Sequence, residues 1–232
     1  MNYFDYEIIT SLNQYAQISP ALDATIKILA KNHIIKGGVF LTLFWWLWFG
    51  NSEHRKKIRE SLIATLFGCF VAIFVARVCA KLLPFRFRPI HDEELAFTLP
   101  YTMQRSALEG WSAFPSDHAV LFFALSAGLF YVSKKIGVFA FLYTTFVICL
   151  PRIYLGLHYP TDIIGGAFIG IAIAMICQSQ VLQQRVSVPL SEYSTSKPQI
   201  FYPLMFVITY QIADMFIHVR DLLSAMWIAM NG

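Results

Sequence analysis

Residues 152–178 read RIYLGLHYPTDIIGGAFIGIAIAMICQ and contain both halves of the pattern on which the fold depends. The first eleven positions include an arginine, a histidine and an aspartate, whereas the run 163–178 is apolar. Such a run is typical of a membrane-spanning helix, so the polar residues before it lie where that helix would meet water. Within the run, Gly166 and Gly170 form a GxxxG pattern, which predicts close packing against a neighbouring helix. The same succession of a polar cluster and an apolar run recurs along the chain.

The composition of the chain indicates a membrane protein. Of its 232 residues, 57% are hydrophobic and 14% are charged, whereas a soluble domain carries about 25% charged residues. The mean hydropathy is +0.56. The net charge is only +4, and basic residues cluster at the ends of apolar runs instead of along one face, which argues against a nucleic-acid partner. Five apolar runs, whose ends extend into flanking polar residues, are expected to cross the membrane: 34–50, 60–80, 117–133, 137–151 and 163–178.

The remaining segments flank these runs. Residues 1–33 are mildly apolar and are predicted to form one or two interfacial helices along the membrane surface. Residues 34–180 would form the transmembrane catalytic domain, and residues 181–232 a polar linker with a C-terminal helix. The stretch 200–230 is apolar but interrupted by ionisable groups, so it is either a sixth span or an amphipathic surface helix. The predicted fold is an all-α integral membrane protein, a bundle of five or six transmembrane helices with N-terminal interfacial helices.

Alternation of the spans predicts that the polar clusters share one face of the membrane. If all five runs cross, the loops at 81–116 and 152–162 lie on the same side. Basic residues crowd the short loops at 51–59 and 134–136 on the other side, and the positive-inside rule makes those loops cytoplasmic. Over all loops the basic residues are nearly balanced, and the asymmetry appears once the cluster cations are set aside as anion ligands. We therefore expect the clusters on the extracytoplasmic face of the plasma membrane.

The cluster Pro115-Ser116-Asp117-His118 begins one of the predicted helices. Proline favours the first turn of a helix, and the free backbone N–H groups of that turn make a ready site for an anion. Ser116 adds a hydroxyl donor. A simple helix cap beside an interfacial histidine is the alternative interpretation.

The cluster from Arg152 to Asp162 adds a candidate nucleophile. His158 precedes Pro160, which is expected to start a helix, so Asp162 lies in the first turn of that helix. The four-residue spacing lets the carboxylate accept a hydrogen bond from one ring nitrogen of His158, leaving the other with a free lone pair. Arg152 offers a planar fork of donors for phosphate oxygens. Alternatively, these are polar residues at a membrane surface and Arg152 extends toward water.

The third cluster contributes cations. Lys81 and Arg88 lie seven residues apart, and Pro89 restricts the chain behind Arg88. Arg86 is either a further ligand or a contact for lipid headgroups, and Arg77 either extends toward water or pairs with a carboxylate.

Taken in order, these clusters resemble the signature of the type-2 phosphatidic acid phosphatase family. The matching patterns are Lys81-x6-Arg88-Pro89, Pro115-Ser116-x-His118 and Arg152-x5-His158-x3-Asp162. Within that family the chain is most similar to bacterial undecaprenyl-pyrophosphate phosphatases of the bacitracin-resistance type. It departs from the family pattern at Asp117, where glycine is common, and at Pro151, where serine is common.

The resemblance implies a role for each position. His158 would attack phosphorus and form a phosphohistidine, His118 would protonate the departing oxygen, and Asp162 would orient His158. Asp117 is expected to point its carboxylate away and to contribute its backbone amide. The groups that would bind the phosphoryl oxygens are Lys81, Arg88, Ser116, the amide of Asp117 and Arg152.

The implied function is hydrolysis of a polyprenyl diphosphate to the monophosphate and phosphate, without a metal or other cofactor. Another lipid phosphate (phosphatidate, phosphatidylglycerophosphate or lipid A) is an alternative substrate, and a lipid phosphotransferase is an alternative enzyme. An anion transporter is the alternative outside enzymes, although a transporter would place its ionisable groups near the membrane midplane. The expected partners are the lipid substrate and membrane lipids, with no prediction of oligomeric state.

Overall fold

The computed structural model describes residues 1–101 and 103–231, and within these ranges the regular structure is entirely helical. The all-α class predicted from the sequence is thus confirmed. The long helices are α1 (Tyr3–Asn13), α2 (Pro20–Lys31), α3 (Val39–Phe49), α4 (Arg55–Leu82), α5 (Asp117–Val132), α6 (Lys134–Tyr143), α8 (Pro160–Cys177), α11 (Pro198–Ala213) and α12 (Ile217–Asn231). Shorter helices join them: η1 (Ile34–Gly38), η2 (Pro89–His91), η3 (Glu93–Leu95), η4 (Thr144–Cys149), α7 (Leu150–Tyr154), α9 (Gln180–Leu182), η5 (Gln183–Ser187) and α10 (Val188–Ser196).

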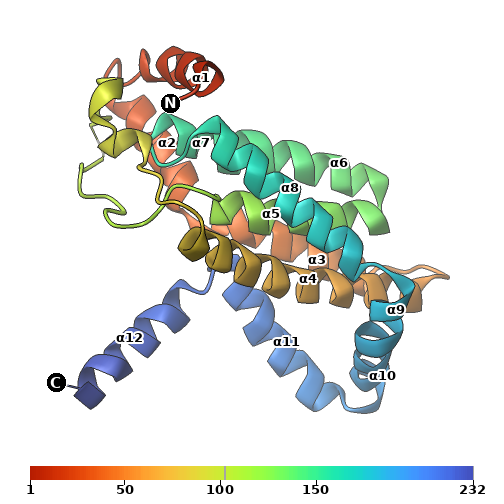
Figure 1. Cartoon of the computed structure of the whole chain (residues 1–232). Helices are drawn as coiled ribbons and strands as arrows, with labels where there is room; N and C mark the ends of the chain where they lie inside the picture. The colour runs from red at the N-terminus through yellow and green to blue at the C-terminus, as the bar shows by residue number, and fades with distance from the viewer. Residues whose placement is uncertain (102, 232) are drawn as a thin grey trace.

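Helix α5 lies at the centre of a bundle, between α4, α6 and α8 (Figure 1). Its sequence is apolar around most of its circumference, as expected of a helix that is surrounded by others. Val120, Leu121 and Phe122 are fully buried in consecutive positions, so the helix has neighbours on every side. Because α5 starts at the polar cluster around Ser116, its burial fixes the position of that cluster.

Helix α8 packs closely against α5, as the GxxxG pattern predicted. A methyl group on Gly170 would overlap the carbonyl oxygen of Val120, and one on Gly166 would lie 2.9 Å from the carbonyl oxygen of Ser116. The two glycines therefore allow the backbones to approach each other near the start of both helices.

Helices occupy all five predicted spans. By length and hydropathy, three helical stretches in the described ranges are candidate membrane spans: Arg55–Leu82, Lys134–Tyr154 and Pro160–Cys177. The stretches Ile34–Phe49 and Asp117–Val132 are also apolar but shorter. Counting a bent C-terminal pair as one span brings the number to four, against the five or six expected from the sequence.

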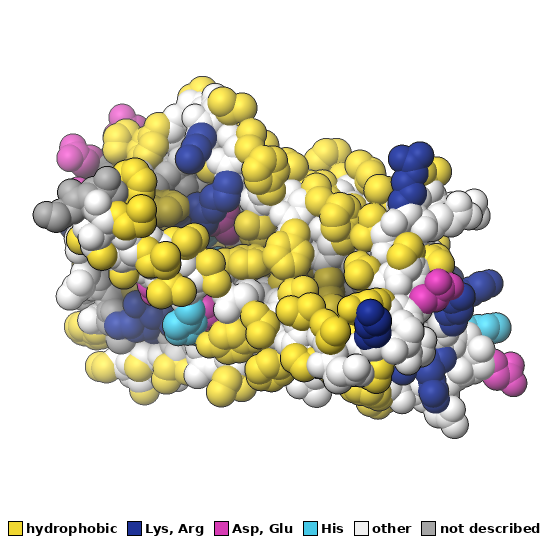
Figure 2. Space-filling view, turned by 90° about the horizontal axis from the view of Figure 1, so that it is seen from below, with side chains coloured by type: hydrophobic (Ala, Val, Ile, Leu, Met, Phe, Trp, Pro, Cys, Tyr) yellow, Lys and Arg dark blue, Asp and Glu magenta, His cyan; other side chains and the backbone are white. Residues whose placement is uncertain are grey.

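The surface of the bundle is apolar in its middle and charged at its ends. Figure 2 shows hydrophobic side chains across the central part of this face, with basic, acidic and histidine side chains toward the two ends. Large apolar side chains are exposed on several bundle helices, among them Phe74 on α4, Phe139 on α6 and Phe168 on α8. This distribution is that of a multi-pass membrane protein.

Two helices form the N-terminal segment, as predicted. Helices α1 and α2 lie at one end of the bundle, where α1 packs against α7 and α8, and α2 against α7 and η4 (Figure 1). Each contains a buried carboxylate, Asp5 in α1 and Asp23 in α2. The segment is therefore attached to the bundle through polar contacts at the end where α5 and α8 begin.

The C-terminal stretch bends sharply. Helix α11 packs along α3 and reaches η1, whereas α12 turns away at 91° and leaves most of its side chains exposed (Figure 1). Met215 and Phe216 adopt positive φ at the bend. Residues 200–230, for which the sequence left a sixth span and an amphipathic surface helix as alternatives, thus form two helices that together could make one bent span.

Candidate active site

The structure gathers the cluster residues His118, Arg88, Arg152 and His158 at the bundle end that carries α1 and α2. His118 lies in the first turn of α5, Arg152 in α7, and His158 in the turn that joins α7 to α8. The two histidines lie close enough to interact electrostatically. Residues from distant parts of the sequence thus share one face of the molecule, as alternation of the spans predicted.

The turn that carries His158 depends on a glycine. Gly156 has a φ of +68°, and its carbonyl accepts a hydrogen bond from the backbone N–H of Ile90 at 3.0 Å. A Cβ atom at this position would lie 2.7 Å from the ring of Phe97, so only glycine fits both the backbone and the space. The segment after Arg88 is thereby attached to the turn before His158.

His158 is buried and fixed in one tautomer. Its Nδ1 lies 2.9 Å from the carbonyl oxygen of Ala113, so Nδ1 carries the proton and donates it to that oxygen. Its Nε2 then carries the lone pair, which accepts a hydrogen bond from Nη1 of Arg88 at 3.3 Å. Burial is the main cause that lowers the pKa of His158 to about 4, and nearby Arg88 lowers it further, against the raising effect of Asp162. At neutral pH the imidazole is therefore uncharged, as a nucleophile must be.

Asp162 lies beside His158 without the direct hydrogen bond that the spacing predicted. Its Oδ2 is 3.8 Å from His158 Nδ1 and instead accepts the backbone N–H of Tyr159 at 2.7 Å. The reason is local: Asp162 is the third residue of α8, where a carboxylate caps the free N–H groups of the first turn. The hydrogen bond from His158 goes to Ala113, whose position depends on the long segment between α4 and α5.

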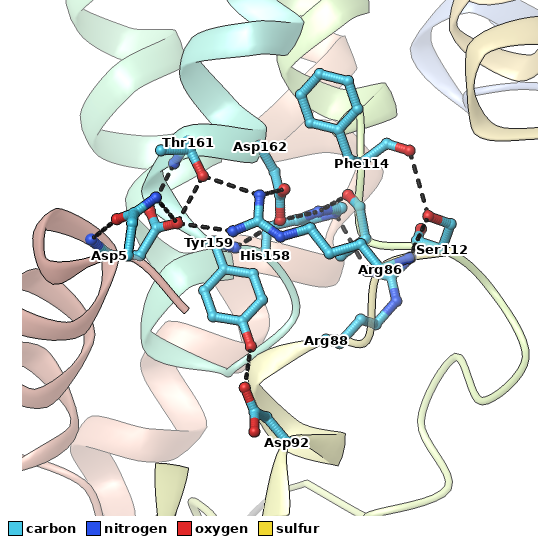
Figure 3. Close-up of polar contacts among 12 residues, drawn as sticks. Asp5, Arg86, Arg88, Asp92, Ser112, Phe114, His158, Tyr159, Thr161 and Asp162 are labelled. Carbon is cyan, nitrogen blue, oxygen red and sulfur yellow. Dashed lines mark hydrogen bonds and ion pairs between the residues drawn. The ribbon is translucent and has the colours of Figure 1, made fainter. Parts of the chain in front are cut away.

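Arg86 connects Asp162 to the N-terminal helix α1 (Figure 3). Its Nη1 donates to Asp162 Oδ1 at 2.5 Å, and its Nη2 donates to Asp5 Oδ2 at 2.7 Å. The guanidinium also lies over the ring of Tyr159, 4.2 Å from its centroid. Arg86 was left between two interpretations by the sequence, and the structure shows that it bridges two buried carboxylates.

Asp5 is fully buried, and its carboxylate accepts hydrogen bonds from identifiable donors. Besides Arg86, it accepts the backbone N–H of Thr161 at 2.9 Å and the Thr161 hydroxyl at 2.6 Å (Figure 3). These contacts fix the first turn of α8 from the side opposite to His158. Sequence reasoning missed Asp5, and the available signal was a lone acidic residue in a mildly apolar N-terminal segment.

Arg88 is buried among backbone carbonyls. Its guanidinium donates to Trp111 at 3.2 Å, to Ser112 at 3.1 Å and to Leu157, in addition to facing His158. Burial lowers the pKa of Arg88 to about 10, which leaves it charged at neutral pH. A fixed positive charge is thus presented to Nε2 of His158.

His118 is surrounded by cations. Its Nε2 lies 3.1 Å from Nη1 of Arg152 and 3.3 Å from Nζ of Lys36. Lys36 lies in η1 and is buried. It was not among the predicted site residues, although a lysine at the start of the first span lies, by alternation of the spans, on the same face as the clusters. Cations with buried donors converge here, which is an arrangement suited to a phosphoryl group.

The other predicted residues divide into those near and those away from the histidines. Ser116 is buried as the N-cap of α5, where its hydroxyl lies 3.5 Å from the backbone N–H of Ala119. Asp117 directs its carboxylate to Arg77, which also lies over the ring of Trp111. Lys81 is exposed at the end of α4 and, in the described part of the chain, forms no hydrogen bond or ion pair. The structure thus leaves Lys81 apart from the other cluster residues.

Comparison with known proteins places this arrangement among lipid phosphatases. Residues 62–185 match the PAP2 superfamily. Undecaprenyl-diphosphatase BcrC of Bacillus subtilis (strain 168) is 26% identical over 74% of this chain and 81% of its own length. Bacitracin transport permease protein BcrC of Bacillus licheniformis is 33% identical over 45% of this chain and 50% of its own. The crystal structure of Aquifex aeolicus LpxE aligns with a TM-score of 0.50 at 25% identity, covering 74% of this chain and 92% of that one.

Proposed function

This chain belongs to the PAP2 superfamily, and from that premise we propose that it is an undecaprenyl-diphosphatase, which hydrolyses a polyprenyl diphosphate to the monophosphate and phosphate. The similarity to BcrC of Bacillus subtilis supports the substrate class. The observation that carries the proposal is the tautomer of His158. Its Nδ1–H donates a hydrogen bond to the carbonyl oxygen of Ala113, so the lone pair lies on Nε2, which faces the cation Arg88.

In the first step Nε2 of His158 attacks the terminal phosphorus. The N–P bond forms while the bond between phosphorus and the bridging oxygen breaks, and the electron pair stays on that oxygen. Arg88 and Arg152, with the first turn of α5 at Ser116, stabilise the charge that spreads over the phosphoryl oxygens. When phosphate oxygens accept the N–H groups that Arg152 and Lys36 otherwise direct at Nε2 of His118, that nitrogen takes up a proton from water. It gives this proton to the departing oxygen, which leaves as part of the lipid monophosphate.

In the second step water hydrolyses the phosphohistidine. His118, now without its proton, accepts one from the attacking water, and phosphate leaves as the N–P bond breaks. Asp162 stays in place through both steps because Tyr159 and Arg86 hold its two oxygens, and its negative charge stabilises the positive imidazole of the intermediate. His158 then returns to its starting form.

We also propose that the site faces the extracytoplasmic side of the plasma membrane. Lys134 and Lys135 begin α6, and Arg55 begins α4, at the bundle end opposite to the histidines. The positive-inside rule assigns that end to the cytoplasm. Intact cells that produce the protein should release phosphate from a membrane-impermeant diphosphate added outside, and release that requires permeabilised cells would reverse the assignment.

The test of the function is a panel of lipid phosphates assayed side by side for released phosphate. Detergent-solubilised protein should cleave undecaprenyl diphosphate with a higher kcat/KM than phosphatidate, phosphatidylglycerophosphate or lipid A, and should remain active with a metal chelator present. A higher kcat/KM for one of the other lipids would make that lipid the proposed substrate. Complete loss of activity with the chelator would contradict the metal-independent mechanism.

The Bacillus licheniformis relative is named a bacitracin transport permease protein, which keeps an anion transporter as the second candidate. A transporter breaks no bond, so detergent-solubilised protein would release no phosphate from any lipid in the panel. Release of phosphate, lost when His158 is replaced, separates the two functions.

A further inference from the structure

Lys36 and Arg152 form a pair of buried cations on one nitrogen atom. Lys36 is 3% exposed and Arg152 is 7% exposed, and both approach Nε2 of His118. Within the described residues neither side chain lies in an ion pair with a carboxylate. Asp214 interacts with Lys36 only beyond ion-pair distance, because its oxygens contact His33 and His218. Buried cations are ordinarily paired, so two unpaired ones at a single imidazole indicate a place built for an anion.

Around Nε2 of His118 the protein has more hydrogen-bond donors than acceptors. Nε of Arg152 is buried without a hydrogen-bond partner, while Nη1 of the same side chain lies 3.4 Å from the carbonyl oxygen of Ala30 and 3.1 Å from His118. Arg152 therefore keeps donor capacity inside the protein that no protein acceptor uses. A phosphate group, with several charged oxygens, matches that surplus.

The backbone holds Lys36 in position from two sides. The hydroxyl of Tyr143 donates to the carbonyl oxygen of Ile35 at 2.7 Å, and Gly37 packs so closely against Ala213 that no side chain would fit there. The π-helical turn of η1 is thereby attached to the α6 helix on one side and to the end of α11 on the other. Such fixed placement is what electrostatic stabilisation of a reacting group requires.

We propose that Lys36 binds the lipid monophosphate that departs in the first step, and thereby makes the site selective for diphosphates over monophosphates. This inference rests on the proposed function and on His118 as the group that protonates the departing oxygen. When His158 attacks the terminal phosphorus of a diphosphate, the electron pair of the broken P–O bond stays on the bridging oxygen. That oxygen takes the proton of His118 and becomes part of a lipid monophosphate, which still carries negative charge on its other oxygens and departs next to His118, where Nζ of Lys36 lies.

A monophosphate substrate makes no comparable demand. Its leaving group is an alcohol, which takes one proton from His118 and departs without charge. Lys36 has then no anion to stabilise on the leaving side, whereas Arg88 and Arg152 still serve the transferred phosphoryl group. Loss of the Lys36 charge should therefore slow the two reactions by different factors.

The experiment compares farnesyl diphosphate with farnesyl monophosphate, which share one lipid tail, on the full-length chain in detergent. Lys36→Met removes the charge and retains much of the side-chain volume. We expect kcat/KM for the diphosphate to fall about 100-fold and that for the monophosphate to fall less than about 10-fold, the range seen when one charge-stabilising donor is removed. Lys36→Arg should retain part of the preference. Lys31→Met, at an exposed lysine that ends α2, is the matched control and should leave both values unchanged.

The ratio of the two kcat/KM values does not depend on the fraction of folded protein, so partial misfolding of a variant leaves the result interpretable. An equal loss on both substrates would overturn the inference while leaving the phosphatase function standing. A wild-type protein that cleaves neither substrate would remove the proposed function and this inference with it.

Discussion

His158 and His118 lie at the same end of the bundle and each has an arginine at its Nε2, yet their remaining partners differ. The Nδ1–H of His158 donates a hydrogen bond to the carbonyl oxygen of Ala113, and Oδ2 of Asp162 lies 3.8 Å from the same nitrogen. His118 has two cations, Lys36 and Arg152, at its Nε2. One imidazole is therefore fixed by acceptors that belong to the fold, and the other contacts groups whose charge suits a ligand.

The difference separates the two tasks that the proposed reaction needs. A nucleophile needs a constant orientation and a free lone pair, which a backbone carbonyl at Nδ1 supplies. A proton donor needs surroundings that change when substrate arrives. Phosphate oxygens can accept the N–H groups that Arg152 and Lys36 otherwise direct at His118, so binding of the substrate changes the charges that this imidazole meets.

The strongest test of the comparison is to remove the nucleophile. His158→Ala should lower kcat by at least about 10⁴-fold, because no neighbouring group can form the covalent intermediate. Released phosphate, and phosphohistidine trapped by rapid quenching in the wild type, would measure this. Retained activity in the variant would show that water attacks directly and would end the assignment of separate roles.

Removal of the proton donor should have a smaller effect that depends on the leaving group. His118→Ala should lower kcat on a lipid diphosphate by about 10²–10⁴-fold, the usual contribution of general acid catalysis. An aryl phosphate whose leaving group needs no proton should recover much of the lost rate in the first step. His158→Ala should not recover with the same substrate. Recovery in both variants, or in neither, would contradict the comparison.

Arg86 should matter to one histidine only, because it touches Asp162 and has no contact with His118. Arg86→Met removes the bridge to Asp5, and a small misplacement of this kind costs about 10–100-fold in kcat. Asp5→Asn should have a similar effect, and the double variant should be no worse than the single ones because both remove the same bridge. Arg55→Met, at an arginine that contacts Asn51 at the opposite end of the bundle, is the control. Additive losses would show that Arg86 and Asp5 act independently.

The smallest expected effect is on the pH dependence of kcat/KM, whose acid limb reports the pKa of His158. The pKa of His158 is lowered to about 4, so protonation removes the nucleophile only below the ordinary range of a histidine. The acid limb of kcat/KM should therefore lie near pH 4, once ionisation of the substrate is accounted for. Asp162→Asn removes a cause that raises this pKa, so the limb should move to still lower pH while activity falls. A limb near 6.5 in the wild type would mean that water reaches His158 freely.

The arrangement of the spans could be predicted from sequence because it depends on short-range patterns. Apolar runs identify helices, their alternation assigns Ser116 and His158 to one face, and the spacing of Gly166 and Gly170 predicts that their helix packs closely against a neighbour. The bend between α11 and α12 could not be predicted in this way. It depends on positive φ at Met215 and Phe216, neither of which is a residue that favours such a conformation.

The details of the site were less accessible, because they depend on long-range contacts. The partner of His158 Nδ1 is a backbone carbonyl 45 positions away, in a segment that has little regular structure. A sequence pattern carries no sign of such an acceptor. Lys36 could have been found by extending the alternation argument to the start of the first span. Lys81, which the spacing to Arg88 favoured, lies exposed in the last turn of α4.

The contacts of Asp5 also impose an order on biosynthesis. Asp5 lies 156 positions before Thr161, its hydrogen-bond partner at the start of α8. At about 5–20 residues per second, translation produces that partner roughly 10–30 s after Asp5 has left the ribosome. A carboxylate without its partners stays in water, so α1 must wait at the membrane surface until α8 is inserted. Helix α1 is thus made before α8 but docks only after it, and its docking completes the support of Asp162.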